Sequence, residues 1–232
     1  EFRTERTIQE KLINWGEDGL MLSMEDYPFY SNLLNIPKHQ IPCGIFKGYV
    51  GSHALAKAFR DRGCDVVLSG QGGDSLFVEG ITDLNNLSFN IGDEFENGEE
   101  SDLIYKPLDI KLISFYSNTA IIDFISSARV GQNDDPLKLW ARKWLKNILI
   151  PELSQYAYFA DFFGLTLWGL NQSLPQIADL FEETYFLTKS PIFSPRNVKR
   201  YLHQDLFSFE HKEYISFCSL ISVAVWYHSL MQ

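Results

Sequence analysis

The residues best suited to chemistry form a glycine-rich turn after a short apolar run. Val66-Val67-Leu68 is typical of a buried strand, and an aspartate closes the turn that follows. The turn consists of Ser69, Gly70, Gln71, Gly72, Gly73 and Asp74. A glycine turn between a strand and a helix offers backbone N–H groups to a phosphate, and an aspartate carboxylate is a suitable Mg²⁺ ligand. The motif therefore predicts a nucleotide-phosphate site at residues 69–74.

We expect a helix and then a strand before this turn, and these two elements would hold it in position. We expect a helix over residues 52–62, capped by Ser52 and stopped by Gly63, and a strand over Asp65–Leu68. The order helix, glycine, strand, glycine turn is typical of parallel α/β proteins. The alternative interpretation is a tight strand–helix turn that binds no ligand.

Charge and cysteine content limit the class of protein. The chain has 232 residues and a formal net charge of −10, which argues against a nucleic-acid partner. The cysteines Cys43, Cys64 and Cys218 form no CxxC pair, which fits reduced thiols, and we expect the latter two in the core. We see no signal peptide and no apolar run long enough to cross a bilayer. A cytoplasmic protein without a membrane partner is expected.

The rest of the chain shows short elements and then mostly helical patterns. Residues 4–15 favour a helix, and 16–49 favour short elements joined by loops. The acidic stretch 92–102 predicts a solvated loop, with a metal site of Asp93, Glu94 and Glu96 as the alternative. Further helices are expected over residues 109–128, 136–149, 173–187, 194–204 and 209–231.

Two other features have both a structural and a functional interpretation. The aromatic segment 156–168 fits core packing. Because Gly164 and Gly169 would interrupt a helix there, the alternative is the wall of a substrate channel or a partner surface. The five histidines lack the spacing of metal ligands, and we expect His228 to be a hydrogen-bonded residue at the core or its edge.

The glycine turn in its helix–strand context resembles the asparagine synthetase C-terminal domain family. This family includes asparagine synthetase, the β-lactam and carbapenam synthetases and the lasso peptide cyclases. Its members carry Ser-Gly-x-Gly-(Gly/Ala/Ser)-Asp-x-Leu-Phe after a strand, which corresponds to residues 69–77 here. The passages 54–59, 143–153 and 224–226 also resemble the family. The similarity covers residues 40–232 and is strongest at 65–77.

The resemblance implies an α/β fold of the nucleotide-hydrolase-like kind (adenine nucleotide α-hydrolase type), in which a parallel sheet region precedes a largely helical one. It also implies an AMP-forming amide ligase. A small-molecule or peptide carboxylate attacks the α-phosphate of ATP, and an amine then displaces AMP from the acyl-adenylate. By position, Ser69, Gly70, Gln71, Gly72 and Gly73 would bind ATP and Asp74 would bind Mg²⁺. A peptide-modifying or natural-product variant is favoured over asparagine formation.

Parts of the family's active site have no counterpart in the sequence. The pyrophosphate loop Ser-Gly-Gly-x-Asp-Ser is absent, and so is the glutaminase domain of asparagine synthetase. Relatives carry a catalytic lysine where Phe159 stands here, and no lysine occurs between Lys146 and Lys189. A phenyl ring cannot neutralise phosphate charge as an ammonium group does. No catalytic residue is therefore assigned.

Two explanations of these gaps stay open. Either the chain is the larger part of a longer or split enzyme, whose companion chain or segment carries the pyrophosphate loop, or it is a catalytically inactive homologue that serves as a binding or scaffold subunit. On both explanations we expect an incomplete α/β adenylating region at residues 1–91, an acidic loop at 92–107 and a helical region at 108–232 packed on it.

Overall fold

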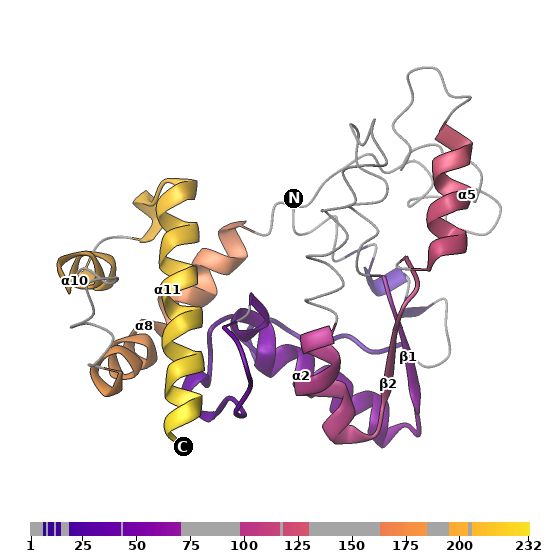
Figure 1. Ribbon diagram of the computed structural model, residues 1–232, viewed down its shortest axis with the longest axis horizontal. Helices are drawn as coiled ribbons and strands as arrows, with labels where there is room; N and C mark the ends of the chain where they lie inside the picture. Colours follow the sequence, from indigo (N-terminus) through magenta and orange to yellow (C-terminus); the bar gives the residue numbers. More distant parts are fainter. Residues whose placement is uncertain are drawn as a thin grey trace. The chain divides into compact units, whose positions relative to one another are not determined.

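A computed structural model describes a large part of the chain, and its architecture is mixed α/β. The described residues are mostly helical and contain a parallel pair of strands (Figure 1), so the α/β class expected from the sequence is confirmed at this level. They belong to two compact units, which contain residues 1–21, 66–98 and 111–161, and residues 22–65, 99–110 and 162–232. The described residues are 7, 9–11, 13–14, 19–42, 44–70, 98–116, 118–129, 163–184, 195–203 and 206–232.

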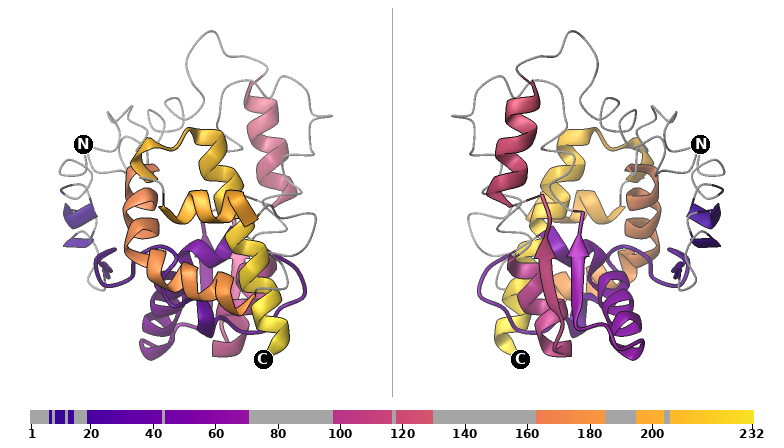
Figure 2. Two further views of the ribbon diagram at one scale, coloured as in Figure 1. Left: turned by 90° about the vertical axis from the view of Figure 1, so that its left-hand side faces the viewer. Right: turned by 90° about the vertical axis from the view of Figure 1, so that its right-hand side faces the viewer.

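The first unit holds the sheet, in which β1 (Val66–Ser69) pairs in parallel with β2 (Lys111–Ser114). Val66 lies opposite Lys111 and Ser69 opposite Ser114, and Figure 2 shows the two strands side by side. The strand expected at 65–68 is confirmed with a shift of one residue. Parallel strands need a long crossover between them, and here the chain runs from residue 69 to 111 before it pairs.

Two expectations for the sheet region are wrong. The helix expected over residues 109–128 is interrupted, because residues 111–114 form β2 and only α5 (Thr119–Arg129) is helical. Pairing with β1 overrides the weak helical pattern of this segment. The β1 strand is also not buried, since Val66 is 51% and Leu68 67% exposed while the alternate residues are half-buried. An apolar run does not tell whether one face of a strand or both are covered.

The second unit is helical, and its longest helices contact each other directly. Helix α11 packs against α8 and against the short helices η1 and η2. Its elements are η1 (Leu33–Asn35), η2 (Gly44–Gly48), α2 (Tyr49–Asp61), η4 (Ser101–Tyr105), η5 (Lys106–Leu108), α8 (Phe163–Glu183), α10 (Pro195–His203), η6 (Leu206–Ser208) and α11 (His211–Met231). These bounds confirm the helices expected at 194–204 and 209–231 and the short elements at 16–49.

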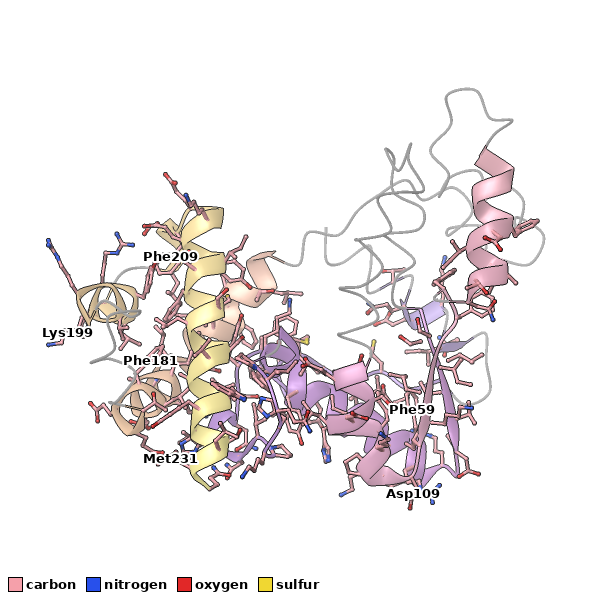
Figure 3. All side chains as sticks on the ribbon, viewed as in Figure 1. Phe59, Asp109, Phe181, Lys199, Phe209 and Met231 are labelled. Atoms are coloured by element: carbon pink, nitrogen blue, oxygen red, sulfur yellow. The ribbon has the colours of Figure 1, made fainter. Side chains whose placement is uncertain are left out.

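Aromatic rings form the core around α11. Phe217 is fully buried, and its ring centroid lies 5.0 Å from that of Tyr201, 6.0 Å from that of Phe209 and 6.4 Å from that of Phe181. Phe181 and Phe209 are labelled beside α11 in Figure 3. Ring pairs at such separations add stabilisation beyond the area they bury. The cluster joins α8, α10 and the segment before α11 to one face of α11.

Helix α2 begins earlier than the sequence suggests. It starts at Tyr49, directly after η2, so Ser52 lies inside the helix and caps nothing. A 3₁₀ turn leads into α2, and such a turn can supply carbonyl partners to the first N–H groups of a helix that has no side-chain cap. The expected stop at Gly63 is confirmed: its φ is +79°, and its N–H donates to the Arg60 carbonyl at 2.9 Å.

Part of the expected acidic loop is helical. Residues 98–100 are helical and lead into η4, a π-helical turn that buries Leu103, Ile104 and Tyr105. The Lys106 ammonium group pairs with the Asp102 carboxylate at 2.7 Å across one helical turn. The loop prediction is therefore wrong for residues 98–102, because the acidic residues share their helix with an apolar face. Residues 92–97, including the alternative metal ligands, lie outside the described residues.

Glycine does not interrupt α8. This helix begins at Phe163 rather than at residue 173 and runs through Gly164, Gly169 and Pro175. A Cβ atom on Gly169 would lie 2.8 Å from the backbone nitrogen of Phe29, while one on Gly164 would meet no atom of the described residues within 4 Å. The Ser173 hydroxyl donates to the Phe29 carbonyl at 3.0 Å on the same side. Gly169 thus serves close packing, which corrects the interpretation of a broken helix.

Replacing Gly169 with alanine should destabilise the protein by about 1–3 kcal/mol, because the Phe29 backbone must move away from the added methyl group. Gly164→Ala is the matched control in the same helix, and we expect it to be neutral or to stabilise by up to about 1 kcal/mol through helix propensity. Urea unfolding measures both changes. Equal effects of the two substitutions would contradict the close approach at Gly169.

Candidate functional site

The described part of the predicted nucleotide site is the end of β1. Ser69 is the last residue of the strand and Gly70 follows it, while Gln71, Gly72, Gly73 and Asp74 lie outside the described residues. Among the described residues, no atom lies within 4 Å of the position that a Cβ atom on Gly70 would take. The roles of residues 69–73 toward ATP and of Asp74 toward Mg²⁺ stay predictions.

The carboxyl end of β2 lies at the same edge of the sheet as the end of β1. Ser114 is the register partner of Ser69, and the Phe115 N–H donates to the Ser69 carbonyl at 3.2 Å. In open α/β sheets the carboxyl edge of parallel strands is the usual position of a ligand site. The register therefore brings Ser69, the first residue of the predicted turn, to the edge at which the segment after β2 begins.

That segment leads into α5, whose N-terminus is capped by Asn118. The Asn118 side-chain oxygen accepts a hydrogen bond from the Ala120 N–H at 2.9 Å, and its carbonyl accepts from the N–H groups of Ile121 and Ile122 at 3.0 Å. Figure 1 shows β2 running into α5. The N-terminus of a helix attracts anions, which suits a phosphate site. The Ser-Asn-Thr run at 117–119 is a typical helix-start signal. It was missed because the helix expected over 109–128 ran across it.

Metal ligands do not gather within the described part of the chain. No group of three or more histidine, cysteine, aspartate or glutamate side chains there is arranged to hold a metal ion. The metal role expected for Asp74 concerns a residue outside this part, and the finding does not bear on it.

A second polar cluster, which sequence patterns did not reveal, lies in the helical unit around Tyr30. The Tyr30 hydroxyl donates to the Cys218 Sγ atom at 2.8 Å, and the tyrosine is only 2% exposed. Its backbone adopts a φ of 61°, a conformation that is rare for a bulky residue, and its N–H donates to the Lys47 carbonyl at 2.7 Å. Cys64 and Cys218 are free and half-buried, so neither is the full core residue expected from the sequence.

The phenols and the thiol of this cluster are uncharged at neutral pH, and burial moves their pKa values further above it. Burial raises the pKa of Tyr30 far above the usual range and that of Tyr214 to about 12. Burial also raises the pKa of the Cys218 thiol, an effect that hydrogen bonds from the two phenols and the charge of Lys47 oppose. A thiol in this state is a poor nucleophile. The cluster therefore suits packing and polar contact, not covalent catalysis.

Raising the pH should reduce the free energy of unfolding from about pH 10 to about pH 12. The phenol of the unfolded chain loses its proton near the ordinary tyrosine pKa of 10.0, whereas folded Tyr214 holds its proton up to about 12, so the stabilisation present below pH 10 is lost across this window. Urea unfolding of the wild type and of Tyr214→Phe at a series of pH values measures the slope. We expect a shallower slope in the variant, and identical slopes would contradict the assignment.

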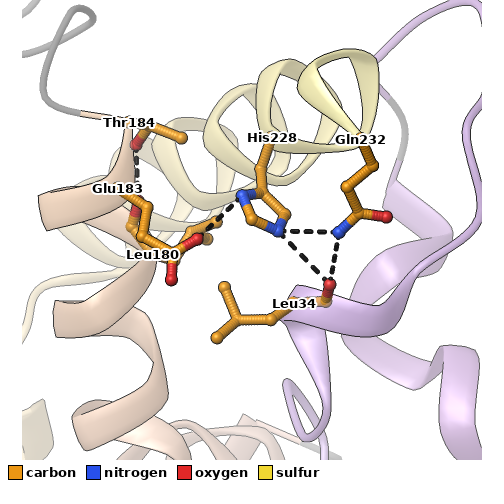
Figure 4. A network of polar contacts seen from close by, with 6 residues as sticks. All are labelled: Leu34, Leu180, Glu183, Thr184, His228 and Gln232. Carbon is orange, nitrogen blue, oxygen red and sulfur yellow. Dashed lines mark hydrogen bonds and ion pairs between the residues drawn. The ribbon is translucent and has the colours of Figure 1, made fainter.

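The prediction for His228 is confirmed. In Figure 4 its Nδ1 atom lies 3.1 Å from the Glu183 Oε2 atom, and its Nε2 atom lies 3.3 Å from the Leu34 carbonyl oxygen. The Gln232 side-chain amide donates to the same carbonyl at 2.7 Å and lies 2.8 Å from the imidazole Nε2. These contacts tie the last turn of α11 to α8 and η1, which is a structural role at the edge of the core.

By length and composition alone, α11 is also a candidate membrane span. Residues Lys212–Met231 have a mean hydropathy of 1.3, and 28% of the apolar window is buried. This differs from the sequence expectation that no apolar run is long enough. Phe217, Ile221, Ala224 and Val225 are fully buried although most of the window is not, and core helices of water-soluble proteins can satisfy the same length and composition criteria. Within the described residues this helix is weak support for a membrane span.

Comparison of the chain with protein-family models, with curated proteins and with solved structures found no match. The resemblance to the asparagine synthetase family, and the nucleotide-hydrolase-like form of its α/β fold, therefore stay predictions that rest on the motif at residues 65–77 and its flanking elements.

Proposed function

We propose that the chain is an ATP-dependent, AMP-forming amide ligase of the asparagine synthetase type, with its nucleotide site at the carboxyl edge of β1 and β2. The parallel register of the two strands carries this proposal. It brings Ser69-Gly70, the start of the predicted phosphate turn, to the edge at which Asn118 begins α5. Gly70 has no Cβ atom, and none of the described residues crowds that side of its backbone, which would suit the close approach of a ligand.

The residues at this edge suit the charge changes of adenylation. In the reaction a carboxylate oxygen attacks the α-phosphorus of ATP, the bond to the β-phosphate breaks, and pyrophosphate leaves. Backbone N–H groups of the glycine turn and the positive end of α5 would stabilise negative charge on the phosphates. Mg²⁺ held by Asp74 would neutralise part of the same charge. The substrate is a small-molecule or peptide carboxylate. A companion chain or segment supplies the pyrophosphate loop, and the reaction takes place in the cytoplasm.

The absence of a lysine between Lys146 and Lys189 favours a second candidate function. An inactive homologue could keep the nucleotide site and act as a binding or scaffold subunit. The two functions differ in one property, because only the ligase transfers AMP to a carboxylate.

Calorimetric titration with ATP and Mg²⁺ tests the nucleotide site shared by both functions. Asp74→Ala should weaken binding of the Mg²⁺–nucleotide complex by about tenfold or more, since a metal ligand is lost and the phosphate charge is less well balanced. Asp123→Ala is the matched control, because it removes one exposed carboxylate from α5 in the same unit. Equal affinities of wild type and Asp74→Ala would contradict the metal role of Asp74, and absence of binding would contradict the site.

Isotope exchange between pyrophosphate and ATP distinguishes the two functions. The ligase predicts Mg²⁺-dependent exchange in the presence of a carboxylate substrate and, where needed, of a co-expressed companion segment. Nucleotide binding without exchange under the same conditions would contradict the ligase and leave the binding subunit as the function.

A further inference from the structure

A groove of about 420 Å³ lies within the helical unit, lined by residues around η2 and by the first half of α11. Tyr30 lies in it as an almost fully buried side chain, whereas Lys47, which also lines it, is exposed. Cys218 and Tyr214 add a thiol and a second phenol to the lining. The groove therefore combines an exposed cation with a buried polar contact where Tyr30 meets Cys218.

Among the described residues, Lys47 is the only charged side chain that lines this groove. No described carboxylate takes part in the lining, although the chain as a whole carries a net charge of −10. None of the described carboxylates forms an ion pair with Lys47. Phenols and thiols are ordinarily protonated at neutral pH, and burial raises the pKa of these groups further, so none of them balances the ammonium charge. The described lining of the groove thus carries one positive charge and no negative charge.

The other walls supply apolar surface and few hydrogen-bond donors. Ile215 is 49% exposed at the groove, and Val223 lies two helical turns further along the same helix. The Ser219 hydroxyl donates to the Ile215 carbonyl at 2.9 Å, and the Ser222 hydroxyl donates to the Cys218 carbonyl at 3.0 Å. Since these hydroxyl protons are already used, the ammonium group of Lys47 is the strong donor that a ligand would meet.

We propose that this groove binds a small organic carboxylate, whose anionic end contacts Lys47 and whose hydrocarbon body covers Ile215 and Val223. A lone inorganic anion would use only the lysine and leave the apolar wall exposed, and a cation would be repelled. A carboxylate with an apolar body matches both observations. The site is independent of the amide-ligase proposal, because it is built entirely from the helical unit and needs neither ATP nor the glycine turn.

Ligand-observed NMR with 3-phenylpropionate and with hexanoate tests this site on the intact chain. We expect saturable binding of at least one of the two, and about three- to tenfold weaker binding to Lys47→Gln, which keeps much of the length of the side chain and removes its charge. Lys57→Gln on α2 is the matched control, because it removes an exposed charge outside the groove and should leave the affinity unchanged.

A neutral analogue separates charge recognition from simple apolar binding. 3-Phenylpropionamide should bind wild type and Lys47→Gln equally, and more weakly than 3-phenylpropionate binds wild type. Equal affinity of the carboxylate for wild type and Lys47→Gln would overturn the proposal, as would absence of saturation by both carboxylates. Circular dichroism of the variants verifies that each is folded, and activity in pyrophosphate exchange plays no part in the result.

Discussion

The proposed nucleotide site depends on the parallel pairing of β1 and β2. Because both strands run in the same direction, the residues that follow Ser69 and Ser114 leave the sheet at one edge. An antiparallel pair would have sent the glycine turn and the start of α5 to opposite edges. Asn118 then caps α5 after this edge, so a helix N-terminus follows β2 at the edge where the predicted phosphate-binding turn begins. The proposed nucleotide site depends on this register more than on any single side chain.

The second unit depends on close packing along α8 and α11. Gly169 lets the backbone around Phe29 lie against α8, and Tyr30, the next residue, reaches Cys218 on α11 with its hydroxyl group. The left-handed backbone at Tyr30 is maintained by this packing and by the hydrogen bond to Lys47. Lys47 and Tyr30 both line the groove. The packing that holds Tyr30 in place therefore also forms part of the groove wall.

The sequence predicted local elements well where strong periodicity or stop signals exist. The α10 and α11 helices, the end of α2 at Gly63 and the hydrogen-bonded role of His228 were all predictable. Features that depend on distant partners were not, because a sequence does not show which segment packs where. Residues 111–114 form a strand because they pair with β1, and Gly169 is needed because the Phe29 backbone lies close to it. The Tyr30–Cys218 contact joins residues 188 positions apart, and no local sequence pattern predicts it.

Hydrogen exchange with and without ATP and Mg²⁺ reports where a nucleotide binds along the chain. If the nucleotide site lies at the carboxyl edge of β1 and β2, we expect slower exchange of backbone amides in residues 69–76 and 115–122 and no change in residues 214–223 of α11. Protection confined to α11 would contradict the nucleotide site at the carboxyl edge of the sheet, as would unchanged exchange throughout the chain at saturating nucleotide.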